Sequence, residues 1–168
     1  MNPFLLLGLI GAVVFDWKTR KIPNGLTLSL ALCGLMFQWM QFGFAGLTSG
    51  MSGLVVGGFL LFLPFALGGM GAGDVKLLAA VGAWTGPWGV VQVFLAAAIA
   101  GSLLCLAEAA RQKKLSKILK NIRARIFSFV FYKTWTVEAE PKTRERLFVP
   151  YAAAIMTGYL VVLYLGGE

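Results

Sequence analysis

The stretch IPNGLTLSLALCGLMFQWMQFGFAGLTSGMSGLVVGGFLLFLPFALGGMGAG, residues 22–73, runs for 52 residues without an Asp, Glu, Lys or Arg. A helix needs about 20 apolar residues to cross the hydrocarbon core of a bilayer, so this stretch has room for two spans and a turn. Glycines at positions 43, 46, 50 and 53 mark the turn. We therefore expect spans at about 24–42 and 50–67, followed by a glycine-rich segment at 68–73.

Three more uncharged stretches occur, at residues 1–15, 77–107 and 147–167. The second contains Trp-Thr-Gly-Pro-Trp at 84–88, where Gly-Pro ends a helix and paired tryptophans favour a membrane interface. Further spans are expected at about 4–15, 74–83, 88–107 and 147–165. The predicted fold class is therefore all-α, a polytopic membrane protein with about six transmembrane helices, in which residues 1–168 form one transmembrane domain.

The composition agrees with a membrane protein and excludes several chemistries. Hydrophobic residues make up 58% of the chain and charged residues 13%, against roughly 45–50% and 25% in soluble domains. There is no histidine, which excludes Ser-His and Cys-His nucleophile pairs and imidazole metal sites. Cys33 and Cys105 lie far apart without CxxC spacing, and we expect them to be packing residues. No metal and no cofactor are expected.

The basic residues indicate the topology. All 15 Lys and Arg residues fall at 18–21, at 76 or at 111–146, and six spans place these three segments on one side of the membrane. The positive-inside rule makes that side the cytoplasm and puts both termini outside. The net charge of +8 is then a topology signal, and no nucleic-acid partner is expected.

The basic cytoplasmic loop at 108–146 contains an amphipathic pattern. Over residues 111–132, apolar side chains recur every three or four positions and lysines occupy the other face. This composition is typical of an interfacial helix that lies on anionic lipids. A docking platform for a partner or substrate is the alternative.

Asp16 and Asp74 are the two aspartates of the chain, and each stands at the expected cytoplasmic end of an apolar stretch. An ionisable group at a membrane boundary marks a functional site by default. Helix capping is the alternative; it would explain Asp74, which opens a helix, better than Asp16, which closes one. Two facing carboxylates can share a proton, so that one activates water while the other donates to a scissile carbonyl. This aspartic protease chemistry needs neither histidine nor metal.

Three motifs follow one another along the chain: DWKTRKIPNGLT at 16–27, GAGDVKL at 71–77 and VPYAAAIMTG at 149–158. The second motif resembles the GxGD signature of intramembrane aspartyl proteases. Together, in this order and in a six-span frame, the motifs resemble those of the type IV prepilin peptidases, and the resemblance covers essentially the whole chain.

The resemblance implies an inner-membrane, multi-pass peptidase of a prokaryote that acts with pilus or secretion machinery. Such an enzyme removes the basic leader of prepilins, pseudopilins or preflagellins on the cytoplasmic side, after a glycine. Asp16 and Asp74 match the catalytic pair. Larger members of the family carry two CxxC pairs and also N-methylate the new terminus; this chain has no CxxC, so it resembles a minimal form, and methylation is not expected.

Five further residues of these motifs are expected to shape the site. Gly71 and Gly73 lack a Cβ atom and would let the backbone bend and approach the substrate. Lys76 is expected to extend its ammonium to the membrane interface, with tuning of an Asp pKa as the alternative. Pro23 and Asn24 are expected to start the second helix, with substrate contact as the alternative.

Two other function classes remain open from the sequence. A proton- or cation-coupled transporter subunit would use Asp16 and Asp74 as ion sites, and glycine-interrupted spans suit transporters. Both aspartates lie near one face, however, and no inverted repeat is visible. An inactive scaffold of a secretion machine would instead tolerate replacement of both aspartates.

Overall fold

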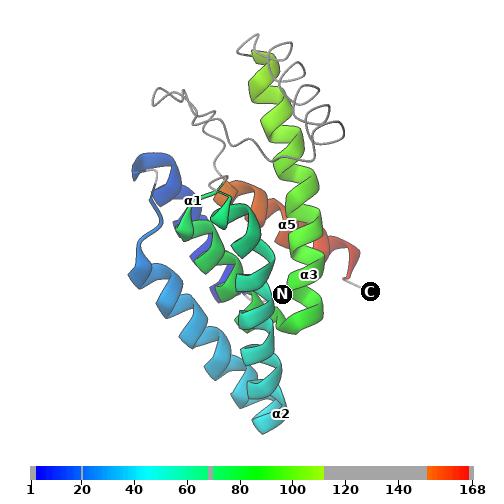
Figure 1. Cartoon of the computed structure of the whole chain (residues 1–168). Helices are drawn as coiled ribbons and strands as arrows, with labels where there is room; N and C mark the ends of the chain where they lie inside the picture. Colours follow the sequence, from blue (N-terminus) through cyan, green and yellow to red (C-terminus); the bar gives the residue numbers. More distant parts are fainter. Residues whose placement is uncertain (1–2, 20, 68–69, 112–150, 167–168) are drawn as a thin grey trace, which may run out of the picture. The chain divides into compact units, whose positions relative to one another are not determined.

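A computed structural model describes residues 3–19, 21–67, 70–111 and 151–166. Their regular structure consists of the helices α1 (Pro3–Thr19), α2 (Asn24–Ala66), α3 (Ala72–Arg111) and α5 (Tyr151–Leu165) (Figure 1). The all-α prediction is confirmed for this part of the chain. The backbone divides into two compact units, residues 1–101 with 150–168 and residues 102–149. Both aspartates lie in the first unit.

Helix α2 consists of two helical segments that meet at Gly43, where the chain reverses direction (Figure 1). Gly43 has φ 59° and ψ −139°, a conformation that side chains with a Cβ atom rarely adopt. The sequence predicts a turn spread over four glycines and a second span that begins at residue 50, and this is wrong in detail. One left-handed residue is enough to reverse the chain, and the helix resumes at once.

Helix α3 is broken in the same way at Gly86, with φ 71° and ψ −178°, directly before Pro87. Proline lacks an N–H and its ring clashes with the preceding turn, so it starts the new segment rather than extending the old one. The predicted break at 84–88 is confirmed. The helical segments on either side are longer than predicted, since α3 starts at Ala72 and runs to Arg111.

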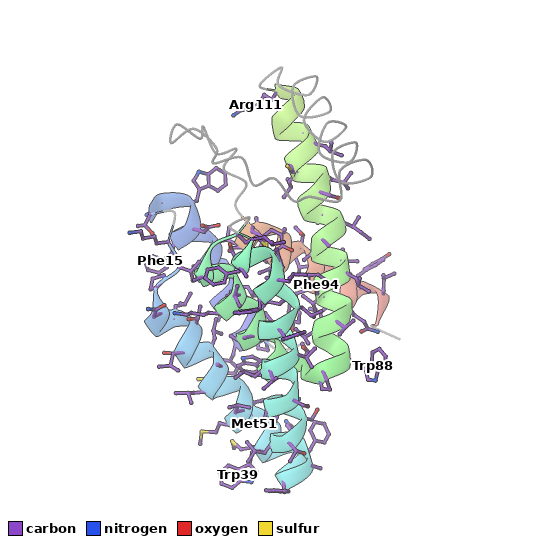
Figure 2. All side chains as sticks on the ribbon, viewed as in Figure 1. Phe15, Trp39, Met51, Trp88, Phe94 and Arg111 are labelled. Atoms are coloured by element: carbon purple, nitrogen blue, oxygen red, sulfur yellow. The ribbon has the colours of Figure 1, made fainter. Side chains whose placement is uncertain are left out.

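Two of the described helices are long and apolar enough to cross a membrane: α2 and the 72–107 part of α3. Large apolar side chains also cover the outside of the first unit, among them Trp39, Met51 and Trp88, which point away from the ribbon in Figure 2. Such a surface is unfavourable in water and is expected against lipid. The protein is therefore a membrane protein, while the count of six spans stays a prediction.

Small residues let α2 and α3 pack closely inside this unit. A Cβ atom at Gly57 would lie 2.6 Å from the carbonyl oxygen of Leu78 and 3.1 Å from Cα of Ala79, so the two backbones nearly touch there. Nearby, the indole Nε1 of Trp84 donates a buried hydrogen bond of 2.8 Å to the carbonyl oxygen of Leu30. These contacts hold the first segment of α3 between both segments of α2.

The basic loop predicted at 108–146 lies outside the described residues, apart from the end of α3. The expected interfacial helix therefore stays a prediction, as does the single-domain organisation.

The contact at Gly57 makes a prediction about stability. Gly57→Ala should lower the free energy of unfolding by about 1–3 kcal/mol, because the new methyl group has no space against the α3 backbone. Gly58→Ala is the matched control, since its Cβ atom would lie 3.7 Å from Cβ of Ala79, an ordinary contact. That variant should be as stable as the parent or slightly more so, because alanine favours a helix. Thermal unfolding in detergent would show the difference, and equal stabilities would contradict the packing.

Candidate active site

Asp74 lies in the first turn of α3 and is held by its own loop. Its backbone N–H donates to the carbonyl oxygen of Gly71 at 3.2 Å, and the N–H of Gly71 donates to Oδ2 of Asp74 at 3.3 Å. The bond from the Gly71 N–H to the Asp74 side chain is one half of a capping box, and the positive end of the helix dipole favours the carboxylate. The capping weighed as the alternative role of Asp74 is therefore present, and it fixes the direction of the half-buried carboxyl group.

Asp16 lies in the last turn of α1 and is only 6% exposed. The C-terminal end of its own helix is unfavourable for a carboxylate. Instead, Asp16 accepts a hydrogen bond from the backbone N–H of Ala152, in the first turn of α5, the helix against which α1 packs. Burial raises the pKa of the Asp16 carboxyl, and the Ala152 N–H acts in the opposite direction. Both aspartates are thus held at the start of a helix.

The fold brings these two carboxyl groups into electrostatic contact, although they come from different helices. Ionisation of one carboxyl group disfavours ionisation of the other when the two lie within electrostatic range. Such an arrangement favours a state in which one group can donate a proton and the other can accept it.

The connector between α1 and α2 packs against the start of α3. Ile22 is buried, and a Cβ atom at Gly73 would lie 3.2 Å from Cβ of Ile22. Asn24 Oδ1 accepts a hydrogen bond of 2.8 Å from Nζ of Lys76. Lys76 thus has a specific protein partner in addition to its exposed position, an arrangement that its sequence position did not indicate.

The structure also clarifies the roles of the small motif residues. Pro23 is the N-cap of α2, and its carbonyl oxygen accepts from the N–H groups of Leu26 and Thr27, so the predicted helix start is confirmed. Among the described glycines, only Gly43 and Gly86 have a positive φ. Gly71 and Gly73 therefore have φ angles that other residues also adopt, and Gly73 provides room for Ile22; their predicted role in bending the backbone toward a substrate stays a prediction.

Sequence reasoning missed two residues of the last helix, Tyr151 and Ala152. The phenol of Tyr151 interacts electrostatically with Asp74, and its ring edge lies against Gly101, where a Cβ atom would be 3.2 Å away from Cε2. The motif at 149–158 contains both residues and indicated that this part of the last helix could belong to the site. The sequence of the motif did not indicate which other helix these residues contact.

The described part of the chain holds no cluster of three or more His, Cys, Asp or Glu residues placed to bind a metal ion. The acid–base groups gathered at this site are instead the two carboxyl groups, with the Tyr151 phenol close by.

Residues 4–106 match the model of the Type IV leader peptidase family, which is more than half of the chain. The prepilin leader peptidase/N-methyltransferase of Pectobacterium carotovorum subsp. carotovorum is 38% identical over 109 residues, which are 61% of this chain and 39% of that protein. The proteins of the same name from Neisseria gonorrhoeae and Escherichia coli (strain K12) are 40% identical over 85 residues and 36% identical over 95 residues. Those alignments cover 46% and 52% of this chain.

The chain spans less than half the length of these relatives, since the alignments cover 39%, 29% and 42% of them. No solved structure matches the chain. The matched range 4–106 contains both aspartates and the contacts of the α1–α2 connector with α3. The family model and these relatives show that the chain belongs to the Type IV leader peptidase family.

Proposed function

We propose that this protein is an intramembrane aspartic endopeptidase that removes the basic leader of type IV prepilins or pseudopilins, or of preflagellins, after a glycine. The observation that carries the proposal is the pairing of Asp16 with Asp74 in a chain of this family. Asp16 is buried and Asp74 is half-buried, so both carboxyl groups are partly shielded from bulk water, which favours a shared proton. Each carboxyl group is oriented by a backbone N–H group.

In this mechanism the ionised member of the pair takes a proton from a water molecule as its oxygen attacks the scissile carbonyl carbon. The protonated member donates to the carbonyl oxygen, which gives a neutral tetrahedral diol. The proton taken from water then passes to the leaving nitrogen as the C–N bond breaks, and a hydroxyl group of the diol returns its proton to the other carboxylate as the product carbonyl forms. The pair ends with one proton, as it began, so no external acid or base is consumed.

We place the active site at the cytoplasmic face of the inner membrane of a prokaryote, in a six-span frame. The contacts of the α1–α2 connector with the start of α3 support a common face for Asp16 and Asp74. Phe15, at the Asp16 end of α1, lies at the other end of the first unit from Trp39 and Met51, which flank the bend of α2 (Figure 2). Lys18, Lys21 and Lys76 share the Asp16 end, and the positive-inside rule makes it cytoplasmic.

The proposed partners follow from this location. The substrate is a prepilin or pseudopilin whose apolar segment enters from the bilayer, and the enzyme works beside pilus or secretion machinery. The basic loop at 108–146 would bind anionic lipids, each Lys or Arg near the surface contributing about 1 kcal/mol.

Asp16→Asn and Asp74→Asn should each abolish cleavage of a prepilin in reconstituted membranes, a loss of at least about a thousandfold, because the pair then lacks either its acid or its base. Both variants should remain folded, since an Asn oxygen can still accept the hydrogen bonds from Ala152 and Gly71. Cleavage is followed by the mobility shift of the substrate, and thermal unfolding is the folding control. Processing by either purified variant would rule out the catalytic pair. Absence of cleavage by the parent protein would favour the ion transporter instead.

The pH dependence of cleavage should be bell-shaped. The rate falls at acid pH when the base member is protonated, and at higher pH when the acid member loses its proton. Because burial raises the pKa of Asp16, the optimum should lie above the usual carboxyl range of about pH 4. Values of kcat/KM, obtained from initial rates across roughly pH 3–10 in one detergent, should pass through a single maximum. A rate that keeps rising through pH 9 would contradict a shared proton.

Gly73→Ala should slow cleavage by about tenfold or more, since the added methyl group would push the Asp74 turn away from Ile22. Gly71→Ala is the matched control in the same motif. Its Cβ atom would lie 3.4 Å from Oδ2 of Asp74, an ordinary contact, so the rate should change by less than about threefold. Equal losses for both variants would show that the glycines serve the backbone or the substrate rather than this packing.

A further inference from the structure

We propose that Lys76 and Asn24 are positioning residues that hold Asp16 and Asp74 at the separation needed to share a proton. Their hydrogen bond ties the first residue of α2, directly after the connector that follows Asp16, to the helix that carries Asp74. The inference rests on the proposed function of the two aspartates as a catalytic pair, and it goes beyond that function by naming what keeps the pair together.

The need for such a tie follows from where the two carboxyl groups are anchored. Asp74 is oriented by Gly71 within its own turn, and Asp16 is oriented by Ala152 of α5. Neither anchor joins α1 to α3. The distance between the carboxyl groups therefore depends on other contacts between the end of α1 and the start of α3.

The connector supplies those contacts on both sides of Asp74 in the sequence. Ile22 packs on Gly73, where a Cβ atom would lie 3.2–3.5 Å from three Ile22 carbon atoms. Asn24 is the first residue of α2 and accepts the 2.8 Å hydrogen bond from Lys76. One apolar contact and one hydrogen bond thus bracket the aspartate.

The position of Lys76 supports a specific role for its hydrogen bond. A cation near the N-terminus of a helix is unfavourable with respect to the helix dipole, and Lys76 lies in the second turn of α3. Hydrogen bonds from a charged donor are stronger than neutral ones, so the Asn24 oxygen compensates for this position. If Lys76 only extended its ammonium group to lipid headgroups, a hydrogen bond to Asn24 would not be needed.

Loss of the bond should let the two carboxyl groups move apart, with two consequences. The rate constant kcat should fall while KM changes little, because the substrate-binding surface is left intact. The electrostatic coupling between the carboxyl groups should also weaken, so their two titration steps should move closer together. A residue that only stabilises the fold would change neither the kcat of the folded fraction nor the titration.

The chain offers a direct readout, because Asp16 and Asp74 are its two aspartates. Protein labelled with ¹³C at the aspartate side-chain carboxyl carbon therefore gives two signals, whose titration can be followed by NMR in detergent. Among the described residues, Tyr151 also interacts electrostatically with Asp74, and phenols ordinarily titrate near pH 10, well above the carboxyl range. This measurement needs no substrate, so it tests the positioning role even if the protein is not a peptidase.

The variants are Lys76→Met, which keeps most of the length of the side chain without a donor, Asn24→Leu, which keeps the branched shape without an acceptor, and their double variant. We expect each single variant to lower kcat by about tenfold and the double variant to be no worse, because both remove the same bond. Lys76→Arg, which can still donate to Asn24, should recover most of the rate. Lys21→Met, on the same connector, removes a positive charge without removing this bond and should keep the parent kcat and titration.

Several results would overturn the proposal. These are an unchanged separation of the two titration steps in Lys76→Met, losses that multiply in the double variant, or an increase in KM alone, which would indicate substrate contact. If the aspartate variants retain cleavage but the titration steps still converge in Lys76→Met and Asn24→Leu, the proposed peptidase chemistry fails while the positioning role holds. Thermal unfolding of each variant keeps the comparison to folded protein.

Discussion

The placement of two carboxyl groups within electrostatic range of each other, one buried and one half-buried, is the constraint on which the rest of this structure depends. Each group is stabilised by the start of a helix: Asp74 by α3, and Asp16 by α5 through Ala152. The positive ends of two helix dipoles thus partly offset the cost of burying negative charge. This is why a carboxylate can persist at the C-terminal end of α1, where its own helix disfavours it.

Close approach of backbones is the second requirement, and glycine provides it. Gly57 brings α2 onto α3, and Gly73 lets Ile22 reach the turn that carries Asp74. These glycines have ordinary backbone angles, so their value lies in the absence of a Cβ atom rather than in conformational freedom. Gly43 and Gly86 serve the opposite purpose, because their positive φ angles reverse two long helices. The same residue type therefore both packs this fold and bends it.

The outward-facing side chains of the first unit include large apolar ones such as Trp39 and Trp88, while its interior is filled mostly by leucine, valine and alanine, with Trp84 and Tyr159 also buried. In lipid there is little hydrophobic gain from helix association, so close packing and buried hydrogen bonds such as that from Trp84 to Leu30 carry more of the stability. The contacts of the connector and of the first residue of α2 with the start of α3 work in the same way, with one apolar contact and one hydrogen bond.

Local features of the sequence determined much of this protein. The uncharged stretches indicated apolar helices, Gly-Pro at 86–87 indicated the break in α3, and the absence of histidine directed attention to Asp16 and Asp74. The first two of these inferences succeeded because hydropathy and proline geometry act within a few residues. Only the tertiary structure decided that Ala152 holds Asp16, that Lys76 binds Asn24, and that one glycine of four forms the turn of α2. Those contacts join residues that are distant along the chain or depend on which helix lies opposite, and no local pattern contains that information.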